Sequence, residues 1–523
     1  MLAIGLVVLA VVAFGFAAYR YAASRQAPQL AIALGLAFLA LVVGILAGVP
    51  PPIPPEPPIP DGGDFGGYRP HLQGFGATTR GGRGGLVCTV DTLTIDGAAT
   101  FGARGGLDDC VAPRPGCADT WESCARIAVF AVSGTASAGV GYVSVTAPYL
   151  TIAGQTAPEG GYTLAGARLL IDTHDVYLGH IRIRRPPVSL NALSIGDAGD
   201  GGDNSHVRNV IVDHVSVSWA TDVNNYLQAG PGSSAIMLVN SLVCEGLWSG
   251  ALGGIGVGVG GDATVIGNVF CHHWSRQPIW GSPARIVVAN NAIYNGTNNQ
   301  WAADTLPAFF GDADGDGSTA SASQTMVIAN VLIPGPDSGA PPAFLGFSKK
   351  QGSIDAGSKS YLQGNQGPGI TGPRGDEQWI ATVCGNYGTY SNAATCGPAS
   401  NMRTDQPFAW FDPATRVVTT DVLAAILANA GARPVERDSA DARVIADVTE
   451  GDGTHYLDWT TIETRYGGMP TITARTRTPA IPANPNAPGS RTLLDGTRNT
   501  VIEDWLETEA QRLEPARGGT RRR

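Results

Sequence analysis

Short apolar runs, separated by one or two polar or small residues, recur along the chain from Val176 onward. Each run is rich in β-branched residues, a composition that predicts short strands rather than helices. Five of these phrases fall in one phase, and they begin at Val210, Ile236, Val265, Ile286 and Met326. The pattern therefore predicts a chain built by repeating one unit of short strands.

The spacing of the phrases predicts a solenoid. The equivalent positions Ser241, Asn268, Asn291, Asn330 and Asn365 are separated by 27, 23, 39 and 35 residues. These steps fit coils of twenty-odd residues with inserted loops, whereas a propeller needs four strands and a steadier period. Asparagine tolerates left-handed backbone, and its amide can bond the same residue of the next coil. We expect Asn268, Asn291 and Asn330 to form a structural ladder; the alternative is chance enrichment of Asn in loops.

The C-terminal part of the chain departs from this repeat. Asp421 is a candidate cap for a short helix over Val422–Ala430 that stops at Gly431, and Val501–Leu513 has helical spacing of apolar residues. We therefore predict a solenoid over residues 70–400 and an extension over 401–523 whose helices pack on it. The last three arginines are expected to form a solvated basic tail.

The N-terminus holds two nearly uncharged apolar stretches, Leu2–Ala18 and Leu30–Gly48, separated by a segment that carries Arg20 and Arg25. Each stretch is close to the length that spans a bilayer, and the positive-inside rule places the two arginines in the cytoplasm. We predict a two-helix transmembrane anchor over residues 1–49; the alternative is a cleaved signal peptide. The Pro/Gly-rich linker over 50–69 would then present a periplasmic or extracellular domain.

Composition narrows the class of protein. Glycine makes up 70 of the 523 residues and charged residues only 15%, as expected for a turn-rich β protein. The net charge of −10 argues against a nucleic-acid partner. Eight cysteines suit an oxidising compartment, and the sequence lacks the Cys and His spacing of a zinc site. We expect Cys244 and Cys271 to be close in equivalent turns, and Cys384 and Cys396 to close a loop.

Five stretches of the chain resemble the bacterial pectate lyase family. They begin, in the family's order, at Gly74, Tyr149, Asn209, Ser275 and Ala442. The third reads Asn-Val-Ile-Val-Asp-His-Val-Ser-Val-Ser-Trp-Ala-Thr-Asp and ends at Asp222, and the fourth reads Ser-Arg-Gln-Pro. The resemblance implies an all-β, right-handed parallel β-helix that cleaves uronate polysaccharides with the help of Ca²⁺.

The implied reaction, β-elimination, removes the proton on the carbon next to a carboxylate. The substrate is already an anion, so a Ca²⁺ ion is needed to neutralise charge, and an arginine can act as base only among other cations. By resemblance, Arg276 stands at the catalytic base position and Asp222 at a calcium ligand; the alternatives are a surface arginine and a turn-capping aspartate. Asp213 and His214 match the family's Asp-His pair, with Asp213 structural and His214 a substrate contact; the alternative is a hydrogen-bonded structural pair on a coil.

The chain also departs from the family's pattern. Asn191, a neutral ligand, stands where the family has an aspartate, and Asp197 and Asp200 lie in an acidic, Gly-rich loop that could supply further oxygen ligands or be a solvated turn. The stretch between Asp222 and Arg276 contains no Lys or Arg, so the family's catalytic lysine has no counterpart there. Arg182, Arg184 and Arg185, on and just after a predicted strand, alternate in direction, so one or two of them could bind a polyanion; the alternative is that they are solvated.

Three functions remain open from the sequence. The leading hypothesis is a membrane-anchored, monomeric, calcium-dependent lyase that acts on an acidic polysaccharide. The second is a non-catalytic glycan-binding or structural β-helix at the cell surface, which the missing lysine and Asn191 favour. The third is a hydrolase or esterase, because parallel β-helices carry several sugar chemistries.

Overall fold

The structure is a computed structural model. It describes residues 72, 74–138, 141–187, 190–196, 204–221, 227–229, 233–247, 262–273, 277–281, 285–296, 308–311, 324–338, 345–347, 359–367, 380–382, 404–411, 420–454, 458–493 and 497–515. The predicted membrane anchor and linker therefore lie outside the described residues. Where the structure describes the chain, no helix combines the length and apolar character needed to cross a membrane.

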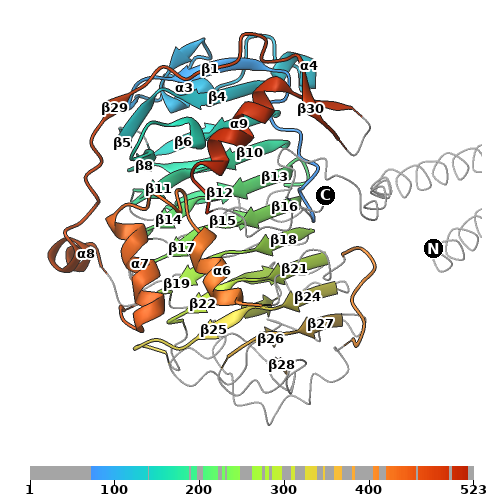
Figure 1. Ribbon diagram of the computed structural model, residues 1–523, viewed down its shortest axis with the longest axis vertical. Coiled ribbons are helices and arrows are strands. Elements are labelled where there is room, and N and C mark those ends of the chain that lie inside the picture. The colour runs from blue at the N-terminus through green and yellow to red at the C-terminus, as the bar shows by residue number, and fades with distance from the viewer. Residues whose placement is uncertain are drawn as a thin grey trace, which may run out of the picture. The chain divides into compact units, whose positions relative to one another are not determined.

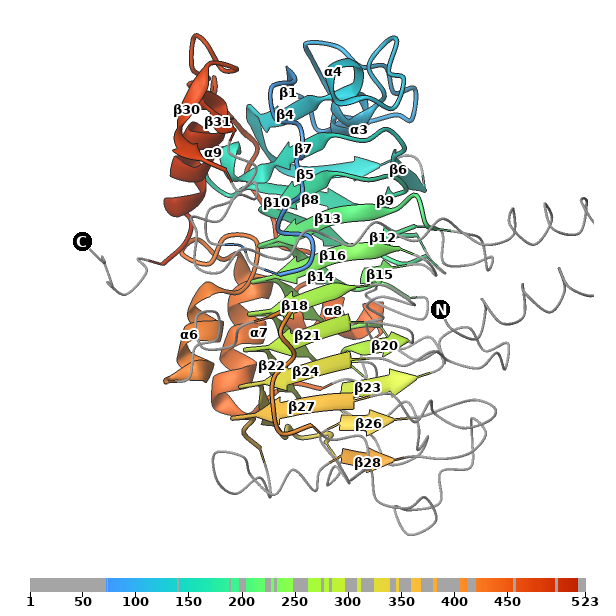
Figure 2. The ribbon, with the colours of Figure 1, turned by 90° about the vertical axis from the view of Figure 1, so that its right-hand side faces the viewer.

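The strands stack into three parallel sheets that run along one axis (Figures 1 and 2). The first sheet contains β1 (Leu86–Val90), β3 (Arg104–Gly105), β4 (Arg126–Phe130), β7 (Leu150–Ala153), β10 (Val176–Gly179), β13 (Arg208–Asp213), β16 (Ser234–Val239), β18 (Ala263–Ile266), β21 (Arg285–Ala289), β24 (Gln324–Ile328) and β27 (Lys359–Gln363). The second contains β2 (Thr94–Ile95), β5 (Val132–Ala138), β8 (Tyr162–Ala165), β11 (Ile181–Arg184), β14 (Ser216–Ser218), β17 (Leu242–Cys244), β19 (Val269–Cys271), β22 (Ala292–Tyr294) and β25 (Val331–Ile333), and β29 (Arg475–Thr476) pairs with β5.

The third sheet is described as two four-stranded pieces. One contains β6 (Tyr142–Val145), β9 (Arg168–Ile171), β12 (Leu193–Ile195) and β15 (Leu227–Ala229). The other contains β20 (Ile279–Gly281), β23 (Ala308–Gly311), β26 (Leu345–Phe347) and β28 (Ile380–Thr382). Successive strands along the chain belong to successive sheets, and each pairs in parallel with its counterpart one coil away. The predicted parallel β-helix is thus confirmed.

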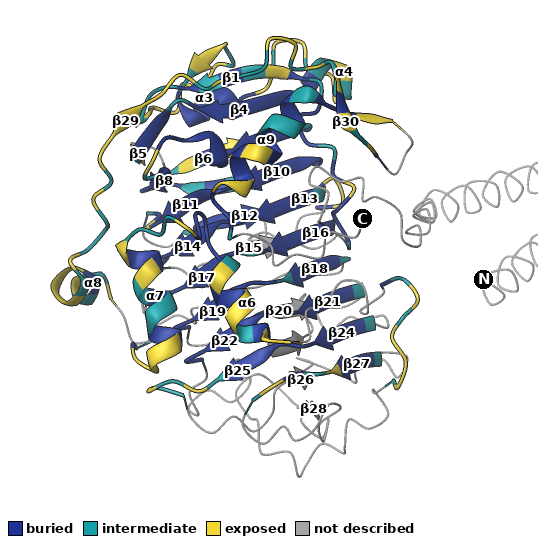
Figure 3. Ribbon diagram, viewed as in Figure 1, coloured by how far each residue is buried: buried dark blue, intermediate teal, exposed yellow. Residues whose placement is uncertain are grey.

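The core is a set of columns of apolar side chains inside the coils. In one column Leu150, Val176, Val210, Ile236, Ala263 and Ile286 are register partners in consecutive strands, and all are fully buried. Burying each large aliphatic side chain contributes roughly 1.5–3 kcal/mol. Figure 3 shows the result, with strands that are buried along nearly their whole length. The short apolar runs of the sequence therefore fold as strands because each adds one layer to this core.

The corner between the first and second sheets carries the asparagine ladder. The side-chain oxygen of Asn291 accepts a hydrogen bond from the backbone N–H of Asn268 at 3.0 Å, and Asn330 does the same for Asn291. The left-handed residue is the one before each ladder residue, for example Asn290 with φ of 50°. The amide ladder is thus present, but the expectation that the ladder asparagines themselves adopt left-handed backbone was wrong.

The C-terminal extension contains four helices and a hairpin in its described part. The helices are α6 (Val422–Asn429), α7 (Ser439–Glu450), α8 (Trp459–Tyr466) and α9 (Val501–Gln511), and the hairpin is formed by β30 (Pro488–Thr492) and β31 (Arg498–Thr500). The predicted helices at 422–430 and 501–513 are therefore present, with ends one and two residues earlier. Asp421 has left-handed backbone and makes no side-chain cap, so its predicted capping role was wrong. The end of the solenoid that begins with β1 carries α3 (Leu107–Val111), α4 (Trp121–Cys124) and η1 (Gly154–Thr156), and α9 lies near it (Figure 1).

The disulfides within the described residues are Cys88–Cys110, Cys117–Cys124 and Cys244–Cys271. The predicted proximity of Cys244 and Cys271 is confirmed, and the reason is the coil repeat, because the two residues are register partners in β17 and β19. Cys384 and Cys396 lie outside the described residues. Disulfides of this kind are typical of domains that fold in an oxidising compartment.

Candidate functional site

The helices of the C-terminal extension cover the outer faces of the first and second sheets but not that of the third. The apolar side chains Ile502 and Leu506 of α9 pack on the outer face of the first sheet, against residues such as Ile127 and Tyr177. Helices α6 and α7 pack on outward-facing residues of the first and second sheets near β17 to β27. In Figure 2 these three helices lie on the opposite side of the solenoid from the strands of the third sheet. Among the described helices, α6, α7 and α9 therefore do not cover the outer face of the third sheet.

Two of the predicted metal ligands and the predicted base precede strands of the third sheet in the sequence, and Asp197 and Asp200 follow β12. Asn191 comes just before β12, and Asp222 and Arg276 come before β15 and β20. Strands β12 and β15 are neighbours, with Leu193 paired to Leu227. Asn191 is partly buried, and its side-chain Nδ2 donates to Ser194 Oγ at 3.4 Å. Asp222, Arg276, Asp197 and Asp200 lie outside the described residues, so their roles stay predictions.

The residue types of the predicted site fit a calcium ion. Asn191 offers an amide oxygen at the start of β12, and the three aspartates offer carboxylates, which are the hard oxygen donors that Ca²⁺ prefers. An all-oxygen set of this kind does not suit zinc, which is bound mainly through histidine and cysteine. The fit rests on donor chemistry and on the position of Asn191.

Arg182 and Arg184 do not reach a polymer surface. Their side chains point outward from β11, as strand alternation predicts, but α7 covers them, and they are 1% and 0% exposed. Arg184 donates through Nη1 to Asp438 Oδ2 and through Nη2 to Asp441 Oδ1, both at 2.6 Å. Arg182 lies 3.0 Å from the same Asp438 carboxylate. The prediction that these two arginines bind substrate is therefore corrected: they bind the chain's own helix.

This ionic contact shifts the pKa values of its members. Burial by itself would raise the pKa of Asp438, but Arg184 and Arg182 outweigh it and lower that pKa to about 2. Burial would likewise lower the pKa of Arg184, but Asp441 and Asp438 outweigh it and raise that pKa. Asp438 and Arg184 are therefore held in their charged forms within a buried contact.

His214 is also covered by the extension. It is fully buried, its Nδ1 lies 2.6 Å from Asp213 Oδ1, and its ring stacks on His180 with centroids 4.8 Å apart. Tyr177 donates its hydroxyl to the other oxygen of Asp213 at 2.9 Å. Glu514, just after α9, approaches both histidine rings. The structural alternative for Asp213 and His214 is thus the observed arrangement, and the prediction that His214 contacts substrate is corrected.

The sequence has relatives among curated proteins, although no family model matches it. It is 30% identical over 270 residues to "Probable pectate lyase C" of Aspergillus flavus, covering 51% of this chain and 54% of the relative. The same named protein of Aspergillus terreus is 30% identical over 273 residues, with 51% and 54% covered. Over about half of its length the chain is thus similar to proteins named pectate lyase. It spans about half the length of the curated relatives it matches.

Solved structures give weaker likenesses to this chain. The major cedar pollen allergen jun a 1 is 15% identical with a TM-score of 0.36, covering 69% of this chain and 92% of that one. A pectate lyase from Acidovorax avenae subsp. citrulli is 14% identical with a TM-score of 0.35, covering 74% and 99%. Because both TM-scores are below 0.5, we draw no inference from these two likenesses.

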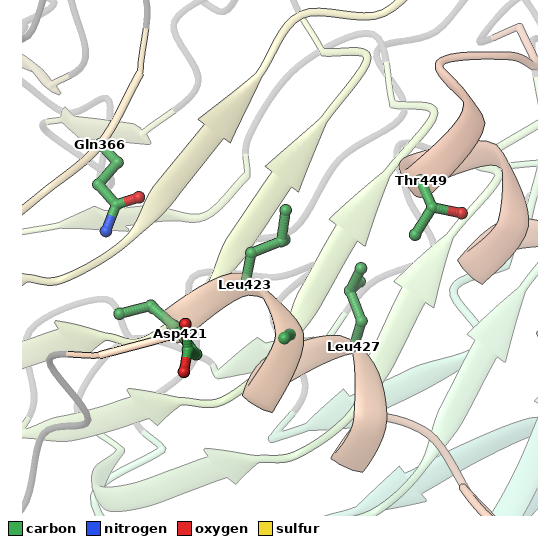
Figure 4. A pocket seen from close by; sticks show the side chains of 7 residues that line it. Gln366, Asp421, Leu423, Leu427 and Thr449 are labelled. Carbon is green, nitrogen blue, oxygen red and sulfur yellow. The ribbon is translucent and has the colours of Figure 1, made fainter.

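One shallow pocket lies at the start of α6, near the end of α7 (Figure 4). It is lined by Gln366, Asp421, Val422, Leu423, Ala424, Leu427 and Thr449. This lining contains one carboxylate and no cationic side chain, which does not suit a polyanionic sugar. It also lies on the side of the molecule that carries the helices, away from the third sheet.

Sequence reasoning missed the acidic face of α7, which pairs with the arginines of β11. Asp438 and Asp441 are three residues apart and so lie on one face of the helix, with Asp438 also capping its first turn. Arg443 of the same helix donates to both oxygens of Glu245 at 2.7 Å. The spacing of these charges was a visible signal, but it does not identify which strand they meet.

Proposed function

We propose that this chain is a calcium-dependent lyase that cleaves a uronate polymer, such as a pectate-like polysaccharide, by β-elimination. The observation that carries the proposal is the relation to pectate lyases, combined with the position of the predicted base and of two predicted ligands before strands of the third sheet. We place the substrate on the outer face of the third sheet. The second sheet is a poorer choice, because its outward-facing Arg182 and Arg184 are buried in ion pairs and cannot reach a polyanion.

The residues divide the work as follows. Asp222, Asn191, Asp197 and Asp200 would hold the Ca²⁺ ion, which when bound neutralises a substrate carboxylate. Arg276 takes the proton from the carbon next to that carboxylate. The electron pair of the broken C–H bond forms a carbon–carbon double bond, and the bond to the glycosidic oxygen breaks. The polymer is thereby split without water, and one product carries an unsaturated sugar.

We place this activity outside the cytoplasm, on a monomer held by its N-terminal apolar stretches. The disulfides Cys88–Cys110, Cys117–Cys124 and Cys244–Cys271 support an oxidising periplasmic or extracellular environment. An acidic polysaccharide would meet the enzyme there. Membrane attachment is tested by whether the full chain stays with membranes after a high-salt wash and is released by detergent.

The test uses the purified full chain and a panel of uronate polymers, with ultraviolet absorbance of the unsaturated product as the measurement. We expect product from at least one polymer, its loss on adding a chelator, and its recovery with excess Ca²⁺. Arg276→Ala should lower the rate by about 10²–10⁴-fold, the usual contribution of a general base. Arg104→Ala is the matched control, because this arginine is exposed at the end of the solenoid with its side chain 75% accessible.

A second function, glycan binding without cleavage, is favoured by the absence of Lys and Arg between Asp222 and Arg276. It predicts that the chain is retained on a uronate matrix but releases no unsaturated product. Retention without product across the panel would replace the lyase proposal by this one. Product that is insensitive to chelator would instead contradict the proposed calcium site.

A further inference from the structure

Three arginines lie on or just after β11, and the structure uses them differently. Arg182 and Arg184 are buried against α7, whereas Arg185 is exposed. The chain turns at Arg185, which has left-handed backbone with φ of 47°. Its N–H donates to Ser218 O at 3.0 Å, so its backbone is tied to the end of β14. Among the described carboxylates, none forms an ion pair with Arg185.

An aromatic platform from the C-terminal extension holds this exposed arginine. The guanidinium carbon of Arg185 lies 3.9 Å from the ring centroid of Trp459, the first residue of α8. Trp459 in turn meets the edge of the buried Trp219 at 5.6 Å, and Trp219 donates through Nε1 to Glu245 Oε2 at 2.9 Å. Stacking of this kind limits the motion of the arginine while leaving the edge of its guanidinium available for hydrogen bonds.

The position of Arg185 relates it to the third sheet. It begins the connection from β11 to β12, the same connection that contains Asn191. Its backbone partner Ser218 ends β14, just before the connection that contains Asp222 in the sequence. Helix α8 packs beside these connections, because Ile462 clusters with Trp219 and with Leu247, which follows β17. Arg185 is therefore on the chain segments that lead into the proposed calcium site.

We propose that Arg185, stacked on Trp459, is a substrate contact that binds a carboxylate of the uronate polymer. The inference rests on the proposed function and extends it, since it assigns one wall of the substrate site to the C-terminal extension. A planar guanidinium stacked on an indole can pair with a carboxylate through two parallel hydrogen bonds. The contact also supplies a fixed cation to a site whose expected lysine is missing.

The experiment measures binding of oligogalacturonate by calorimetry in the full chain that carries Arg276→Ala, so that the ligand is not cleaved. Arg185→Ala should weaken binding by about tenfold, the effect of losing one charge-assisted hydrogen-bonded pair at an exposed site. Arg185→Lys keeps the charge but not the planar pairing and should recover only part of this loss. In the otherwise unchanged enzyme, Arg185→Ala should raise KM by a similar factor and change kcat by less than about twofold.

Arg80→Ala is the matched control, because its guanidinium carbon lies 4.0 Å from the ring of Trp121 in an equivalent stack at the end of the solenoid. It should leave oligogalacturonate binding unchanged. The salt dependence of binding gives a second readout, because an exposed contact between a guanidinium and a carboxylate is screened by salt. The loss caused by Arg185→Ala should shrink at high ionic strength, whereas a merely structural loss would stay the same and overturn the assignment.

Different results would overturn the assignment of Arg185 and the proposed lyase function. If the chain binds oligogalacturonate and Arg185→Ala binds it equally well, the assignment of Arg185 is overturned and the lyase proposal stands. If the chain neither binds nor cleaves any uronate polymer, the proposed function is overturned, and this assignment is rejected with it. Unchanged thermal unfolding of Arg185→Ala would show that a binding loss does not reflect unfolding.

Discussion

The wall of the solenoid that carries the C-terminal helices and the wall formed by the third sheet use polar residues in opposite ways. On the helix-covered wall, the carboxylates and arginines of distant segments neutralise each other, as Arg184 does with Asp438 and Asp441. On the connection that leads from β11 to the third sheet, Asn191 and Arg185 stand at a partly exposed and an exposed position. The comparison teaches that an outward-pointing charge on a β-helix becomes a structural or a functional group according to what covers it.

The largest effect expected on the covered wall follows from breaking its buried ion pairs. Arg184→Ala leaves the carboxylates of Asp438 and Asp441 without their main partner in a buried site, a change that typically costs 3–5 kcal/mol of unfolding free energy. Urea unfolding of the full chain measures this loss. Arg475→Ala removes an exposed pair with Glu159 and should cost less than about 1 kcal/mol. Equal losses from the two variants would contradict the distinction between the walls.

A smaller loss is expected at the asparagine ladder, at the corner between the first two sheets. Asn291→Ala removes the acceptor of the Asn268 N–H and the donor to Val265 O, both buried, and should cost about 3 kcal/mol because each lost partner costs roughly 1–3 kcal/mol. Asn365→Ala, at the end of the described ladder and 8% exposed, should cost less because water can reach its former partners. Chemical denaturation of the two variants gives the comparison. An equal or larger loss of unfolding free energy in Asn365→Ala would show that the position of an asparagine within the ladder does not determine how much it stabilises the fold.

The sequence was sufficient to predict the repeat of strands, but not to predict which strands the C-terminal helices cover. Strand period, the ladder and the pairing of Cys244 with Cys271 all follow from one local pattern repeated along the chain, so they were predictable. The partners of Arg184 were not, because Asp438 is 254 residues away and strand alternation gives only the direction of a side chain. Arg185 was considered together with Arg182 and Arg184, but alternation could not decide which of the three is exposed, since the left-handed turn at Arg185 interrupts it. The roles of Asp222 and Arg276 stay predictions that rest on resemblance.

The smallest expected effect is on how the unfolding free energy depends on pH in acid. The pKa of Asp438 is lowered to about 2, below the value of about 3.9 in an unfolded chain, so its contribution to stability is complete above pH 4 and is lost as the pH falls through about 2. A shift of this size corresponds to about 2 kcal/mol. Urea unfolding at several pH values between 5 and about 2 should therefore show a shallower acid loss in Asp438→Asn than in the unaltered chain.

Arg184→Gln sharpens this acid test, because it removes the charge that lowers the Asp438 pKa while it keeps the carboxylate. With Arg184 gone, burial acts with less opposition, the pKa of Asp438 rises, and the acid-dependent part of the stability should shrink as it does in Asp438→Asn. If Arg184→Gln instead keeps the full acid loss, the ion pairs under α7 do not cause it. The acid dependence of stability would then have to come from carboxylates outside this network.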